Sequence, residues 1–173
     1  QAGSRSNTAE RSARMAAPIA GSPVIAASKV SASIKASDIL AGYPADYVAN
    51  HPGTKFKSWE DDLANSTNFL DAKQFPTITF VSTRFARASA TSYTVEGDLT
   101  MHGITRPVTL AVTASPPFQH AGGTRRAIEA TTSVNRKDFG LRWEFPGEGA
   151  GVVVGDNIKI TIDAELVLQA ERN

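Results

Sequence analysis

The sequence predicts a mainly β fold, an antiparallel sandwich or a closed barrel, formed by a single domain. Three observations lead to this prediction. Apolar and polar residues alternate along six segments, each segment is bounded by Gly, Pro, Asn or Asp, and the segments follow one another at even spacing instead of alternating with helices. At 173 residues the chain is long enough for one domain with a sizeable core and too short for two.

The composition argues against several classes of partner and site. Lys and Arg (18) nearly balance Asp and Glu (17), so the chain lacks the excess charge of a nucleic-acid-binding surface. It has no cysteine, hence no disulfide framework and no thiol nucleophile. No apolar run approaches the roughly 18 residues of a membrane helix. We therefore expect a soluble protein, not an integral membrane protein, that is cytoplasmic or exported after removal of a segment before Gln1.

The amino-terminal region has the weakest pattern. Residues 1–23 are rich in Ala, Ser, Arg and Gly without an apolar period, which is typical of a frayed arm or a weak edge strand. Clear alternation begins with KVSASIKAS at residues 29–37, which predicts a half-buried strand. We therefore expect residues 1–28 to form a divergent arm or early strands, and residues 29–173 to form the barrel.

A long loop and one main helix are predicted next. Residues 41–57 contain two prolines and two glycines, which favours a loop. Ser58 then precedes three acidic residues that suit a first helical turn. We predict a helix that begins between residues 58 and 62 and ends before Phe75.

Five further strands follow the helix. They are read from PTITFVSTRF, SYTVEGDLTM, RPVTLAVTA, RAIEATTSV and DNIKITIDAELVLQ. In each of them one face is apolar. The alternation predicts that Phe80, Leu99, Leu110 and Ile160 point inward, with Phe75 and Trp143 near an end.

The hairpin LTMHGITRPVTLAV places a histidine and an arginine at its bend. His102 has the opposite parity to Leu99 and Met101, so we expect its ring to point away from the interior. Gly103 suits the turn, and Pro107 is expected to open the next strand. An exposed structural corner is therefore favoured over an active site.

Arg136 is the more informative charged residue. Continuing the parity of Ile128, Ala130, Thr132 and Val134 places Arg136 on the inward face at the end of its strand. Burying an arginine on the inward face costs free energy unless the guanidinium is paired or lies at a solvent-filled end of the barrel. An ion pair with Asp138 or Asp71 is favoured over a contact with the polar head group of a ligand.

Catalytic and metal-binding motifs have little support. The chain contains no G-x-S-x-G elbow and no glycine-rich phosphate loop. Its histidines, His51, His102 and His120, do not have the spacing of metal ligands. We therefore expect no catalytic residues, no metal and no cofactor.

The combination of FLDAKQFPTITFVST, VEGDLTMHGITRPVTLAV, VNRKDFGL and VGDNIKITIDAEL resembles the YceI family in its actinobacterial type. The resemblance runs from about Lys29 to Leu168. It implies a lipocalin-like antiparallel β-barrel of eight strands with one main helix over one end, enclosing a long apolar tunnel. Members resemble carriers of isoprenoid chains such as quinones. Apart from this resemblance, a homodimer is a further prediction.

Three departures from the family pattern are visible. The usual first strand with its histidine is reduced to RSARMAAPIAGSPV, and the R-D-x-H-L motif before the helix is replaced by Glu60-Asp61-Asp62-Leu63-Ala64. The loop at residues 41–57 is also longer than in the family pattern. The ligand-binding residues that we expect around the barrel cavity are Phe69, Phe75, Ile78, Phe80, Leu99, Met101, Val108, Leu110, Arg136, Phe139, Trp143 and Ile160.

The leading hypothesis is therefore a non-catalytic protein that binds or carries an isoprenoid, a quinone or another long lipid through burial of apolar surface. The alternative is an enzyme that has adapted the cavity for a polyketide or terpenoid, with Arg136, Asp138, Tyr43, Tyr47 and His51 as candidate groups. A third hypothesis is an interaction protein whose incomplete first strand leaves a sheet edge open.

Overall fold

The computed structural model describes residues 12–15, 29–40, 46–143 and 155–168. Within these residues eight strands form one antiparallel sheet. The strands are β1 (Ser12–Met15), β2 (Val30–Lys35), β3 (Thr77–Arg87), β4 (Ser92–Met101), β5 (Ile104–Ala114), β6 (Phe118–His120), β7 (Gly123–Asn135) and β8 (Asn157–Leu168). The short helices are η2 (Ala36–Asp38), α1 (Tyr47–Asn50), α2 (Trp59–Asn65) and η3 (Arg136–Phe139).

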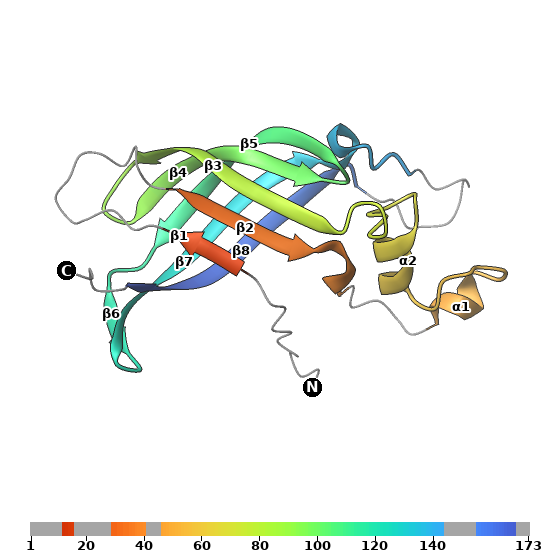
Figure 1. The fold of residues 1–173 in the computed structure, drawn as a ribbon, viewed down its shortest axis with the longest axis horizontal. Coiled ribbons are helices and arrows are strands. Elements are labelled where there is room, and N and C mark those ends of the chain that lie inside the picture. Colours follow the sequence, from red (N-terminus) through yellow and green to blue (C-terminus); the bar gives the residue numbers. More distant parts are fainter. Residues whose placement is uncertain (1–11, 16–28, 41–45, 144–154, 169–173) are drawn as a thin grey trace.

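The sheet is long, twisted and curled, and the helices gather at one of its ends (Figure 1). Neighbouring strands follow the order β1-β2-β3-β4-β5-β7-β8, and the short β6 pairs with the beginning of β7 beside β5. The mainly β, eight-stranded antiparallel fold with a main helix at one end is therefore confirmed. The weak edge strand predicted in the amino-terminal region corresponds to β1, which pairs with β2.

Alternation along the strands separates an inner face from an outer face. The core lies on the inner face, and its buried members are Phe80, Val95, Leu99, Met101, Leu110, Ala130, Val134, Phe139 and Leu141. A bulge between Ser82 and Arg84 shifts the register of β3 against β4, so that Phe85 continues the inner face after Ser82. The inward positions of Phe80, Leu99 and Leu110 agree with the sequence prediction.

The hairpin between β4 and β5 is tighter than predicted. Met101 pairs with Ile104, so the turn consists only of His102 and Gly103, with φ angles of 51° and 71°. Two central residues with positive φ are typical of the turn that matches the twist of paired strands. Pro107 therefore does not open β5 but lies inside it, opposite Asp98.

The helix α2 begins where the acidic run predicted it. The Ser58 hydroxyl accepts a hydrogen bond from the backbone N–H of Asp61 at 3.2 Å and caps the first turn. The region 41–57 was expected to be a loop throughout, but it contains α1. This short helix is held by Tyr47, which is only 3% exposed and whose hydroxyl donates to Asp62 Oδ2 at 2.7 Å.

Candidate ligand-binding site

Most of the residues predicted to bind a ligand meet on the inner face of the sheet. Eight of them belong to the core or pack against it: Ile78, Phe80, Leu99, Met101, Val108, Leu110, Phe139 and Ile160. They come from β3, β4, β5, η3 and β8, which the curled sheet brings around one interior. The inner face of the sheet is thus mainly apolar along these strands.

The two sides of this interior are packed differently. On β3 and β4 the inward Phe80, Leu99 and Met101 are buried, whereas Ile78 and Phe85 are half-buried. The Phe80 ring lies so close to Gly97 that an added Cβ there would be 2.4 Å from a ring carbon. On β8 no described residue is buried, and the inward Ile158, Ile160 and Ile162 are only half-buried. The β8 side therefore retains apolar surface that neighbouring side chains of the described residues cover only in part.

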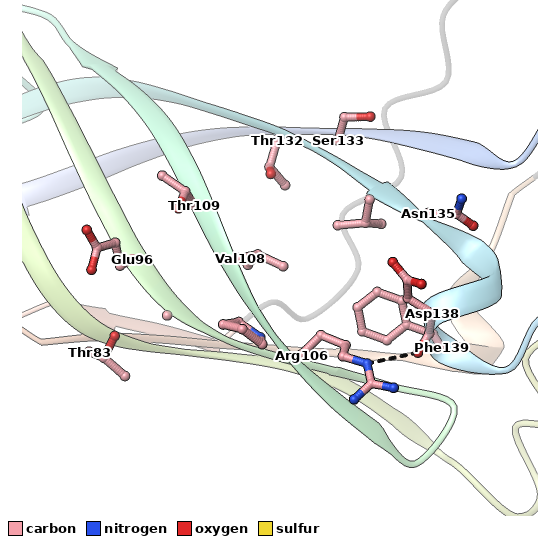
Figure 2. Close-up of a pocket in the computed structure, with 13 residues that line it drawn as sticks. Thr83, Glu96, Arg106, Val108, Thr109, Thr132, Ser133, Asn135, Asp138 and Phe139 are labelled. Carbon is pink, nitrogen blue, oxygen red and sulfur yellow. Dashed lines mark hydrogen bonds between the residues drawn. The ribbon is translucent and has the colours of Figure 1, made fainter.

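A lateral opening separates β5 from β7. The two strands pair only from Ala111 to Ala114 on β5, although β5 begins at Ile104 and β7 continues to Asn135. A cavity of about 500 Å³ lies where the pairing stops, lined by Thr83, Glu96, Gly97, Arg106, Pro107, Val108, Thr109, Thr132, Ser133, Val134, Asn135, Asp138 and Phe139 (Figure 2). Pro107, which has no amide hydrogen to donate, is tolerated here because this part of β5 lacks a neighbour on the β7 side.

The opening has an apolar floor and a polar rim. Val108, Val134 and Phe139 belong to the core or pack against it, and Phe139 is 1% exposed. At the rim, Arg106 Nε donates to the backbone oxygen of Asp138 at 3.2 Å and links β5 to η3 across the gap (Figure 2). The opening therefore joins solvent to the apolar interior.

Arg136 is held by protein atoms at the start of η3. It is 6% exposed, and its three guanidinium nitrogens donate to Leu141 O at 2.6 Å, Asp156 Oδ1 at 3.0 Å and Gly155 O at 3.2 Å. The ion pair expected for this residue exists, but its partner is Asp156, not Asp138 or Asp71. All three guanidinium nitrogens therefore have protein acceptors. Through Gly155 and Asp156, Arg136 joins the end of β7 to the residues that precede β8.

His102 contradicts the expectation of an exposed ring without a partner. It is half-buried, its Nδ1 lies 3.2 Å from Phe139 O, and its ring meets the Phe75 ring edge-on at 4.6 Å between centroids. The side chain of His102 does not follow the alternation of the strand because the residue belongs to the turn. As the first residue of the turn, with positive φ, it turns its side chain back toward η3.

The remaining aromatic candidates lie near the helical end. Phe69 and Trp143 are half-buried, and their ring centroids are 5.2 Å apart. Phe75 packs over Gly103, where an added Cβ would lie 2.4 Å from its ring. These three residues thus lie around the end of the sheet, whereas the strand residues line its interior.

The groups suggested for catalysis do not form one cluster. Tyr47 and His51 stack at 4.3 Å beside Trp59 on the α1–α2 side, whereas Arg136 and Asp138 belong to η3. Among the described residues, no hydrogen bond, ion pair or ring contact joins the two groups. Tyr43 lies outside the described residues. Burial raises the pKa of the Tyr47 hydroxyl, which favours its role as a neutral donor to Asp62.

In the part of the chain that the structure describes, no group of three or more His, Asp or Glu side chains is arranged to hold a metal ion. No helix in the described ranges is long and apolar enough to cross a membrane.

Comparison with solved structures supports the same fold. The YceI protein of Campylobacter jejuni superposes with a TM-score of 0.67 at 17% identity, covering 98% of this chain and 90% of the other. BcnA of Burkholderia cenocepacia gives a TM-score of 0.66 at 22% identity, covering 91% and 84% of the two chains.

Comparison of sequences points to the same group. A UPF0312 protein of Pseudomonas putida (strain GB-1) is 35% identical over 117 residues, which are 67% of this chain and 54% of that protein. One from Pseudomonas fluorescens (strain SBW25) is 39% identical over 82 residues, 47% and 43% of the two chains. The matched regions thus span about half the length of these relatives. These relatives are pseudomonad proteins, so the actinobacterial type stays a prediction. The family model described as the YceI-like domain matches residues 9–166, and the chain therefore belongs to the YceI family.

Proposed function

We propose that this protein binds a long apolar ligand, an isoprenoid, a quinone or another lipid, along the inner face of its sheet. The observation that carries the proposal is the contrast between the two sides of the interior. Leu99 and Leu110 are buried by neighbouring side chains, whereas Ile158, Ile160 and Ile162 are left half-buried. A chain laid against β8 covers this remaining apolar surface.

Burial alone provides the driving force. At about 25 cal/mol per Å², removing about 200 Å² of apolar surface from water contributes about 5 kcal/mol before the entropic cost of association. Such binding needs few directed polar contacts, which fits an inner face made mostly of Ile, Val, Leu and Phe. The isoprenoid class comes from the resemblance to carriers within the YceI family.

The lateral opening between β5 and β7 provides a route for the ligand. Its floor residues Val108 and Val134 continue into the core, and its rim is polar. A ligand entering here passes from solvent onto the apolar interior without crossing a closed strand ladder. Catalysis has less support because the groups suggested for it lie in two separate clusters.

The proposal is tested by titrating delipidated protein with geranylgeraniol and following the complex by native mass spectrometry. Leu110→Asp places an unpaired carboxylate on the inner face and is expected to abolish binding or folding. Ala111→Asp is the matched control, because this neighbouring residue is exposed on the outer face.

A second variant separates binding from folding. Val108→Trp fills the floor of the opening and is expected to retain the β-sheet circular dichroism spectrum while weakening geranylgeraniol binding. Equal binding by the wild type and by both inner-face variants would contradict the proposal. The homodimer stays a prediction, to be tested by the mass of the ligand-free protein.

A further inference from the structure

Arg126 lies on the inner face near the beginning of β7. The register between β7 and β8 is unbroken from Thr124 opposite Leu168 to Asn135 opposite Asn157. The side-chain alternation therefore holds along the whole strand, and Arg126 shares a face with the buried Ala130. Directly opposite Arg126 on β8 is the half-buried Leu166.

The buried Nε of Arg126 has no hydrogen-bond acceptor among the described residues. Its neighbour Arg125 points outward, pairs with Glu165 through Nη1 and donates from Nε to His120 O. The contrast between adjacent arginines shows that the strand supplies counter-charges only on its outer face.

The inner face offers Arg126 no carboxylate. The five acidic residues of the described strands all have outward parity: Glu96, Asp98, Glu129, Asp163 and Glu165. An unpaired buried donor is costly to a fold, and the cost is relieved when an anion with oxygen acceptors occupies the site. The planar fork of arginine matches carboxylate and phosphate oxygens better than other anions.

The position of Arg126 fits the end of an elongated ligand. The beginning of β7 lies beside β6, at the end of the sheet away from α2 and η3 (Figure 1). Along the strand, Arg126 is ten residues from Arg136, which corresponds to about 33 Å. Arg126 is half-buried, so the guanidinium lies where the apolar inner face approaches solvent.

We propose that Arg126 binds the anionic head group, a phosphate or a carboxylate, of an amphiphile whose apolar chain lies along the inner face. This inference rests on the proposed function and specifies the class and direction of the ligand. The head lies at the β6 end, and the tail runs toward α2.

The experiment compares two probes with the same tail, geranylgeranyl phosphate and geranylgeraniol. The wild type is expected to bind the phosphate at least 10-fold more tightly than the alcohol. Arg126→Gln is expected to weaken phosphate binding by about 10- to 100-fold, and to change alcohol binding by less than about 2-fold. Arg125→Gln, the matched control on the outer face, is expected to keep the preference for the phosphate.

Stability measurements separate a binding role from a structural one. Because Arg126→Gln removes a partly buried positive charge whose Nε has no acceptor, the ligand-free variant is expected to melt at the same temperature as the wild type or higher. The rise in melting temperature caused by geranylgeranyl phosphate is expected to shrink. A marked fall in the melting temperature of the ligand-free variant would instead assign Arg126 a structural role and overturn the inference.

The remaining outcomes distinguish the two proposals. If the wild type binds both probes equally and Arg126→Gln changes neither, the head-group role is wrong while the apolar binding function stands. If neither probe binds the wild type, both proposals fail. If inorganic phosphate displaces the lipid phosphate at equal concentration, the site recognises a free anion and the assignment to an amphiphile is overturned.

Discussion

The imidazole Nδ1 of His102 lies 3.2 Å from the carbonyl oxygen of Phe139, which is 37 positions later in the chain. A carbonyl oxygen only accepts hydrogen bonds, so the ring nitrogen carries the hydrogen and donates it. The same ring packs against Phe75. The tip of the β4–β5 hairpin is therefore docked against η3, and this docking fixes one end of the lateral opening.

His102→Ala is expected to lower the free energy of unfolding by about 1 to 2 kcal/mol, because it removes this hydrogen bond and the contact with Phe75. Urea denaturation monitored by circular dichroism measures the change. His120→Ala is the control: its side chain is exposed on β6, and it is expected to cost no more than about 0.5 kcal/mol. Equal effects of the two substitutions would show that the docking contributes nothing.

Arg136→Ala is expected to cost about 2 to 3 kcal/mol, since it leaves the buried Leu141 carbonyl without its donor and breaks the pair with Asp156. Asp156→Ala is expected to cost less, because the Asp156 side chain is 44% exposed and water can replace it as an acceptor. Thermal unfolding in the absence of ligand provides the comparison. Unchanged stability of Arg136→Ala together with weaker lipid binding would restore the head-group interpretation of this residue.

Gly97→Ala is expected to destabilise the protein by about 1 to 3 kcal/mol, because the new Cβ would lie 2.4 Å from the Phe80 ring. Phe80→Leu leaves room for the new Cβ. The double variant Gly97→Ala/Phe80→Leu is therefore expected to lose less free energy of unfolding than the sum of the losses of the two single variants. A double-mutant cycle by chemical denaturation measures this coupling. Strictly additive effects would show that the two residues are not in contact.

The start of α2 makes stability depend on pH. The backbone N–H of Lys57 and, less strongly, the side-chain amide of Asn65 donate to Asp61 and lower its pKa from the usual 3.8. Since the folded pKa lies below the unfolded one, the ionised carboxylate stabilises the fold above pH 3.8. This contribution is lost as the pH falls through the folded pKa.

Asp61→Asn is therefore expected to lower the melting temperature at pH 7, with a smaller difference from the wild type at pH 3. The exposed Asp98 provides the control substitution Asp98→Asn. A difference between wild type and Asp61→Asn that is the same at both pH values would show that the charge of Asp61 does not matter.

The strands and the main helix could be predicted because their signals are local. Alternation placed Phe80, Leu99 and Leu110 on the inner face, and the acidic turn after Ser58 marked the start of α2. The same alternation, extended backward from Ile128 rather than forward to Arg136, also places Arg126 on the inner face. The inward position of Arg126 could therefore have been predicted from the sequence, but it was not.

The rest depended on contacts between distant segments. Sequence alternation does not reveal that β5 and β7 pair only over Ala111–Ala114, so the lateral opening could not be predicted. Asp156 is 20 residues after Arg136 in the sequence and directly precedes β8. It becomes the partner of Arg136 only because β8 pairs with β7, and local sequence does not reveal this pairing. His102 was misplaced because the tight turn, and not the strand, determines the direction of its side chain.

The measurement that tests the central claim most directly is native mass spectrometry of the protein purified from its own host without detergent. Apolar binding along the inner face predicts an adduct whose mass, after release and fragmentation, identifies a lipid with a long hydrocarbon chain. The same preparation of Leu110→Asp is expected to lack the adduct, whereas Ala111→Asp retains it. A wild-type protein that carries no lipid and takes up none when mixed with geranylgeraniol or geranylgeranyl phosphate would contradict the claim.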